Sequence, residues 1–127
     1  MNTTTTIAHL LLRFTGLIQI VLGLLFWTGN ALSLIPLHML VGFILVLSLW
    51  TLAVLAALSG VQRGFVALAI VWGFIVPILG LTQSRLLPGP AHLVIEVLHL
   101  LVGLGAIGQG EGLARRIRQA RSAAPAS

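Results

Sequence analysis

The sequence reads IPLHMLVGFILVLSLWTLAVLAAL at residues 35–58, a run that contains no Asp, Glu, Lys or Arg. About 20 consecutive apolar residues allow a helix to cross the hydrocarbon core of a bilayer. A strand of a membrane barrel would instead alternate apolar and polar residues, and this run does not alternate. The stretch therefore predicts a transmembrane α-helix.

Three further apolar stretches flank this one, at about residues 10–28, 64–82 and 91–112. Turn-forming residues separate the stretches, namely Gly29, Gly60 and the Pro88-Gly89-Pro90 segment. We therefore expect an all-α fold, a four-helix transmembrane bundle, in one domain at residues 1–113. A basic cytoplasmic tail is expected to follow at residues 114–127.

The composition excludes several classes of protein. Hydrophobic residues make up 58% of the 127 residues and charged residues only 7%, which is too little charge to cover a water-facing surface. A soluble enzyme, a disordered chain and a nucleic-acid-binding domain are therefore poor fits. Cysteine is absent, so the sequence also excludes disulfides, thiolate chemistry and iron–sulfur clusters.

The arginines predict the orientation of the chain, because positive charge collects on the cytoplasmic side of membrane proteins. With four crossings, Arg85 falls alone on the outer side. We expect multi-pass insertion into a bacterial-type inner (plasma) membrane with both termini cytoplasmic. The remaining arginines then share the cytoplasmic side: Arg13, Arg63, Arg115, Arg116, Arg118 and Arg121.

A short motif occurs twice and indicates an internal repeat. Residues 37–42 read LHMLVG and residues 98–103 read LHLLVG, so the two copies differ only at Met against Leu. Glycines seven residues apart also recur, at Gly16 and Gly23 and again at Gly73 and Gly80. We therefore expect the bundle to consist of two repeated helical hairpins.

The repeat predicts a site between the second and fourth helices. Parallel repeats are related by an axis along the membrane normal, so His38 and His99 would point at a common centre. That is the arrangement of two axial imidazoles on one flat macrocycle. Gly42 and Gly103 lie one turn after these histidines on the same helix face and would leave room for the edge of the macrocycle. The competing interpretations are helix packing at the glycines and histidines that are bonded to backbone carbonyls.

The partner of His38 stays open between His99 and His92. His38 closely follows Pro36, whereas His99 follows Pro88 by eleven positions. At about 1.5 Å per residue the two imidazoles would differ in depth by over 10 Å, unless the fourth helix begins outside the bilayer. The repeat favours His99.

A four-helix membrane bundle with histidines on two facing helices, and glycines beside them, resembles small b-type cytochromes of the cytochrome b561 type. The resemblance is architectural, covers all four spans and rests on His38, His99, Gly42 and Gly103. It implies non-covalent haem b, bis-histidine ligation and electron transfer with a quinone or a redox protein as partner. If the protein is an enzyme, it is expected to be a quinone-linked oxidoreductase. Only one matched histidine pair is present, which departs from the di-haem pattern.

Two charged residues complete the candidate site. Glu96 lies one turn from both His92 and His99, where it could hydrogen-bond a histidine, exchange protons or simply pair with His92. Arg85 could bind haem propionates through charge-assisted hydrogen bonds, and the alternative is an ordinary solvated loop arginine.

Three other functions stay open. A small proton-coupled transporter would use Glu96 as its coupling residue. A non-haem metal site would use Glu96 with His38, His92 and His99. The chain could also be an accessory subunit of a membrane complex. Expected partners are membrane lipid and, from the GxxxG spacing of Gly108 and Gly112, a second copy of the chain.

Overall fold

A computed structural model describes residues 2–123. The chain forms four long helices: α1 (Thr3–Trp27), α2 (Ile35–Leu58), α3 (Arg63–Thr82) and α4 (His92–Ala123). Single-turn 3₁₀ helices lie in the connections, η1 (Leu32–Leu34) before α2, and η2 (Gln83–Arg85) and η3 (Gly89–Ala91) before α4. All four long helices are long and apolar enough to cross a membrane, and residues 2–123 contain no strand. The prediction of an all-α, four-helix bundle is confirmed.

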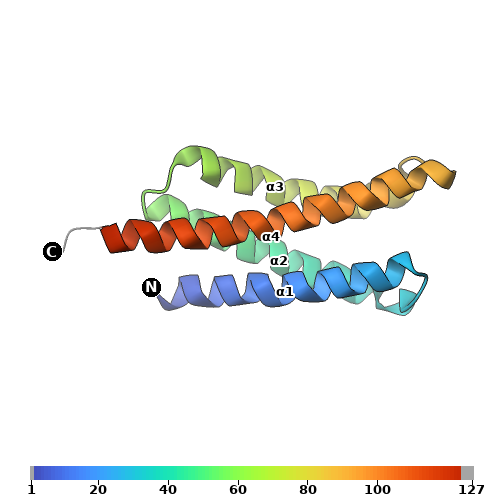
Figure 1. Cartoon of the computed structure of the whole chain (residues 1–127), viewed down its shortest axis with the longest axis horizontal. Coiled ribbons are helices and arrows are strands. Elements are labelled where there is room, and N and C mark those ends of the chain that lie inside the picture. The colour runs from blue at the N-terminus through green and yellow to red at the C-terminus, as the bar shows by residue number, and fades with distance from the viewer. Residues whose placement is uncertain (1, 124–127) are drawn as a thin grey trace.

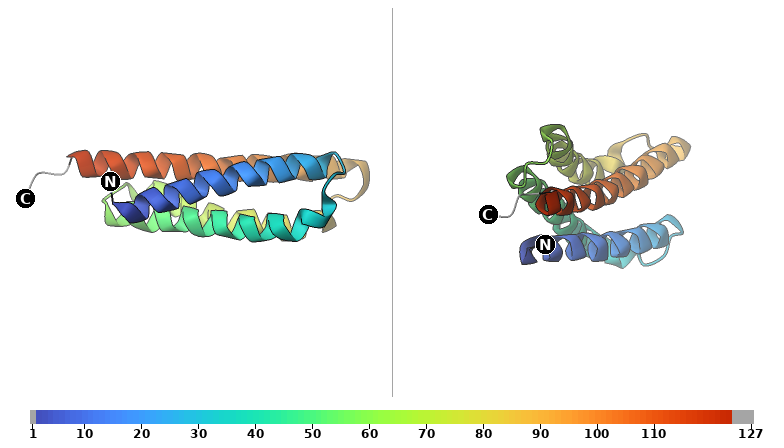
Figure 2. Two further views of the ribbon diagram at one scale, coloured as in Figure 1. Left: turned by 90° about the horizontal axis from the view of Figure 1, so that it is seen from below. Right: turned by 60° about the vertical axis from the view of Figure 1, so that its left-hand side comes forward.

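The helices run up and down as two hairpins, α1–α2 and α3–α4 (Figure 1). The start of α1, the α2–α3 turn and the end of α4 lie together at one end, which we call the basic end. The connections that contain η1, η2 and η3 lie at the opposite end, which we call the loop end (Figures 1 and 2).

The helix boundaries follow local signals. α1 begins earlier than the expected span because the Asn2 side chain caps it by accepting a hydrogen bond from the Thr5 backbone N–H, at 2.8 Å. Pro36 stands in the first turn of α2, where its missing N–H costs nothing. The expected basic tail continues α4 as far as Ala123, and its last residues, 124–127, lie outside the described residues.

The tightest core lies between the middle of the bundle and the basic end. Leu12, Leu49, Leu52 and Ile117 are fully buried there. Small residues surround them and allow the helices to approach closely, among them Ala53, Ala56, Ala69, Ala106 and Ala114.

Two tryptophans join neighbouring helices in the same way. The Trp50 indole of α2 donates a hydrogen bond to the Ile70 carbonyl of α3 at 3.1 Å, and its ring lies over Gly73. The Trp72 indole of α3 donates to the Val102 carbonyl of α4 at 2.8 Å, and its ring lies over Gly105. In each case the glycine is one turn after the accepting residue, so the missing side chain makes room for the ring.

A polar cluster fastens α1 to α4. Arg13 donates to both carboxylate oxygens of Glu111, at 2.6 and 3.0 Å, and Glu111 also contacts the Nε2 of buried His9 at 2.8 Å. The Nδ1 of His9 lies 2.7 Å from an Arg118 guanidinium nitrogen. A guanidinium can only donate, so Nδ1 accepts and the Nε2–H of His9 donates to Glu111.

We predict that Gly105→Ala destabilises the bundle and that Gly108→Ala on the same helix does not. A Cβ at Gly105 would lie 2.9 Å from the Trp72 ring, whereas a Cβ at Gly108 would meet nothing within 4 Å. Overpacking of this kind costs about 1–3 kcal/mol. Thermal unfolding of the purified variants in one detergent measures the difference, and equal melting temperatures would contradict the assigned role of the Trp72 contact.

The two acidic side chains, Glu96 and Glu111, should differ in their effect on stability. Glu111→Gln removes the acceptor that Arg13 and His9 share, so its melting temperature should fall clearly. Glu96→Gln should leave the melting temperature nearly unchanged, because Glu96 lies 4.0 Å from its nearest basic partner, His92. Equal falls in the two variants would show that the Glu111 cluster does not hold α1 to α4.

Candidate functional site

A pocket of about 350 Å³ opens between all four helices in the half of the bundle nearest the loop end. Its lining is mostly apolar, with a few polar side chains, as is typical of cofactor and ligand pockets. The polar residues that the sequence places near a site, His38, His92, Glu96 and His99, all line it.

The lining follows the register of the sequence repeat. In the register that pairs His38 with His99, other lining residues of α2 and α4 match: Ile35 with Glu96, Met39 with Leu100, Gly42 with Gly103, Phe43 with Leu104, and Val46 with Ile107. The register that pairs Gly23 with Gly80 likewise matches the lining of α1 to that of α3 and η2: Gln19 with Val76, Ile20 with Pro77, Leu24 with Leu81, Phe26 with Gln83, and Trp27 with Ser84. The two hairpins therefore present equivalent faces to one central cavity.

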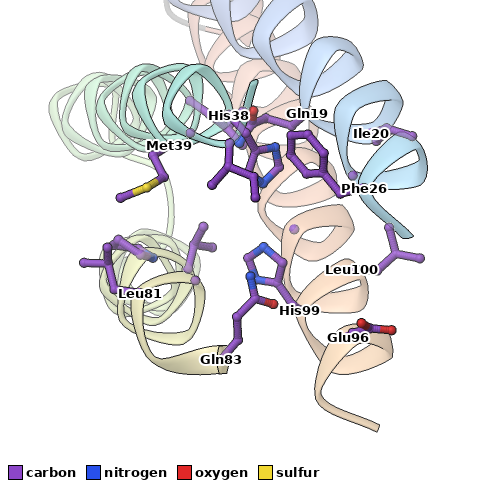
Figure 3. A pocket seen from close by; sticks show the side chains of 18 of the residues that line it. Gln19, Ile20, Phe26, His38, Met39, Leu81, Gln83, Glu96, His99 and Leu100 are labelled. Carbon is purple, nitrogen blue, oxygen red and sulfur yellow. The ribbon is translucent and has the colours of Figure 1, made fainter. Parts of the chain in front are cut away.

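His38 and His99 point toward each other in the pocket (Figure 3). Their ring centroids are 6.2 Å apart and the ring planes are inclined at 64°. The Nδ1 atom of each ring is buried without a hydrogen-bond partner, and no described residue bonds either Nε2 atom. Phe26 packs edge-on against His38 with centroids 5.2 Å apart. The structure thus brings together two imidazoles that the protein itself leaves without a hydrogen bond.

The glycines expected to clear space beside the histidines differ in their surroundings. A Cβ on Gly103 would meet nothing within 4 Å, so this face of α4 is open. A Cβ on Gly42 would lie 2.8 Å from the amide nitrogen of Gln19, so the Gln19 side chain covers that glycine. On α3, Gly80 supports the His99 ring, whose Cε1 would be 3.3 Å from an added Cβ.

His92 has its own partners at the edge of the pocket. Its Nδ1 lies 3.0 Å from the Leu86 carbonyl, and its Nε2 lies 4.0 Å from Glu96. The ring that faces His38 is therefore His99. The expected difference in depth does not arise, because η2 and η3 place the start of α4 far enough beyond the end of α3 for His99 to reach the level of His38.

The other candidate residues do not gather into one ligand set. Arg85 is exposed in η2 and does not line the pocket, although its neighbours Gln83 and Ser84 do. Within residues 2–123, no group of three or more His, Asp or Glu side chains lies close enough to hold a metal ion. The four-residue set considered for a non-haem metal is therefore not assembled in this structure.

Sequence reasoning missed two features of the pocket. Gln19, which lines it and covers Gly42, is a polar residue inside an apolar stretch, and that signal could have identified it. The second feature is a difference between the two halves at the loop end. Residues of the first hairpin are apolar where their counterparts are polar: Phe26 against Gln83, Trp27 against Ser84, and Ile35 against Glu96.

What the pocket can bind follows from these contacts. A flat, largely apolar group would fit among the four helices, and two imidazoles could reach it from opposite sides. If that group has a polar edge, the edge would lie beside Gln83, Ser84 and Glu96, on the α3–α4 side of the loop end.

Comparisons of the chain with protein-family models, with curated proteins and with solved structures found no match.

Proposed function

We propose that the chain is an integral membrane protein that binds haem b through His38 and His99 and transfers electrons. The observation that carries the proposal is the pair of imidazoles that face each other across the pocket without a protein partner. A buried polar group without a hydrogen bond costs about 1–3 kcal/mol. A ligand shared by both rings would explain why the chain keeps two such groups together.

The separation of the rings supports a shared metal centre. A bond from a metal to an imidazole nitrogen is about 2 Å long, so two such rings on opposite sides of one ion have centres about 6 Å apart. The observed separation of 6.2 Å fits this value. The open face at Gly103 supports a planar group rather than a bare ion, because it extends the free space along α4.

Membrane insertion is supported by the outward faces of the helices. Large apolar side chains point away from the bundle along its length, for example Phe14, Leu40, Leu58, Ile78 and Leu101. Exposure of so much apolar surface to water is unfavourable, whereas contact with lipid hydrocarbon is favourable. The arginines at the basic end favour a cytoplasmic location for both termini in a bacterial-type inner membrane.

Bound haem supplies a one-electron couple. Two histidine ligands would leave no open position on the iron, which favours electron transfer over oxygen chemistry. The apolar lining holds water away and affects the potential through burial. A quinone or a redox protein is the partner we propose.

Histidine variants test the proposal directly. Protein purified in detergent after haem supplementation should give a Soret band, and His38→Ala and His99→Ala should each lose most of it. His92→Ala should keep the band, because that ring bonds the Leu86 carbonyl instead. If the wild-type protein has no Soret band, or if the band is unchanged in both His38→Ala and His99→Ala, the proposal is wrong.

A matched pair of glycine variants tests the position of the group. Gly103→Leu places a side chain in the open space of the pocket and should reduce haem content several-fold. Gly108→Leu lies on the same helix at an exposed position outside the pocket and should bind haem like the wild type. Haem per protein, from absorbance and protein mass, measures the effect. Full occupancy in Gly103→Leu would place the group elsewhere.

A further inference from the structure

The basic end carries positive charge that the described residues only partly neutralise. Six of the seven arginines lie toward this end, and Glu111, the one acidic side chain that residues 2–123 place among them, is already bonded to Arg13 and His9. Arg63, Arg115 and Arg121 have no hydrogen bond or ion pair with any described residue. Within residues 2–123 these three guanidinium groups are therefore available to an anionic ligand.

A polar hollow of about 260 Å³ lies at this end, lined by Arg115, Arg116 and Gln119. These residues lie within about one turn of one another on α4, and their side chains carry guanidinium and amide donors. Among the residues that the structure describes, no acidic side chain lines the hollow.

The Arg116 side chain is held in place before any ligand arrives. Its guanidinium lies 3.7 Å above the centre of the Phe65 ring of α3 and donates to the Gly112 carbonyl at 3.1 Å. The absence of a side chain on Gly112 makes this possible, because a Cβ there would lie 2.8 Å from the guanidinium nitrogen. An arginine fixed in this way loses little further rotamer freedom when it binds an anion.

The hollow lies at the level expected for lipid headgroups. A helix crosses the hydrocarbon core in about 20 residues. Counting that length back from Arg115 leads to Ile95, one turn into α4, so one crossing ends near the hollow. Phe65, beneath Arg116, is likewise within the first turn of α3.

We propose that Arg115, Arg116 and Gln119 bind the phosphate group of an anionic phospholipid in the leaflet at the basic end. The arginines supply charge and fork-shaped donors that match a phosphate, and Gln119 adds an uncharged donor. The proposal does not depend on what the central pocket binds.

Native mass spectrometry of the full chain, released from detergent with added lipid, tests this site. The wild-type protein should retain phosphatidylglycerol over phosphatidylcholine of the same chain length by roughly 25-fold, since each of the two arginines contributes about a factor of five near an anionic surface. The variant R115Q/R116Q should lose that preference. R85Q, which removes the arginine at the loop end, should keep it.

A second variant separates the site from general charge and from folding. Phe65→Leu keeps every arginine but frees Arg116, so its preference for phosphatidylglycerol should fall to an intermediate value. An unchanged preference in R115Q/R116Q, or an equal fall in R85Q, would overturn the proposal. Inorganic phosphate in excess should not displace the lipid, and full displacement would assign the hollow to soluble anions instead.

Discussion

The hydrogen bonds from two indoles to backbone carbonyls fix the register of the bundle. Trp50 ties α2 to α3 and Trp72 ties α3 to α4, and each ring can reach its carbonyl only because a glycine leaves space beneath it. In the membrane location that we propose, no hydrophobic force would press the helices together, so close packing and such hydrogen bonds would set their positions. Because these hydrogen bonds position both α2 and α4 against α3, His38 of α2 lies opposite His99 of α4.

The two hairpins line most of the pocket with equivalent residues, but they differ at the loop end. Equivalent positions of the two hairpins supply the facing histidines, the glycines beside them and most of the apolar lining. The loop end departs from this equivalence, since Gln83, Ser84 and Glu96 are polar where the first hairpin has Phe26, Trp27 and Ile35. A ligand with one polar edge would therefore bind in one orientation, which a fully symmetric pocket could not impose.

Much of the fold and the centre of the candidate site could be predicted from the sequence. Continuous apolar runs identify helices because lipid offers no partner for free backbone groups, and the repeated motif identifies His38 and His99 as equivalent.

The different roles of the recurring glycines could not be predicted. Gly73 receives the Trp50 ring and Gly16 receives Ile107, whereas Gly23 and Gly80 line the pocket. Spacing places such residues on one helix face, but the neighbouring helix decides what fills the gap. The same limit applies to Gln19, whose position over Gly42 depends on how α1 crosses α2.

The proposed function requires that both imidazoles coordinate one haem iron. Electron paramagnetic resonance of the oxidised, haem-loaded protein tests it most directly, since two nitrogen ligands should give a low-spin ferric signal. We expect a low-spin signal at one haem per chain that turns high-spin, or is lost, when either His38 or His99 is replaced. A high-spin signal in the wild-type protein, or a low-spin signal that survives both single replacements, would contradict it.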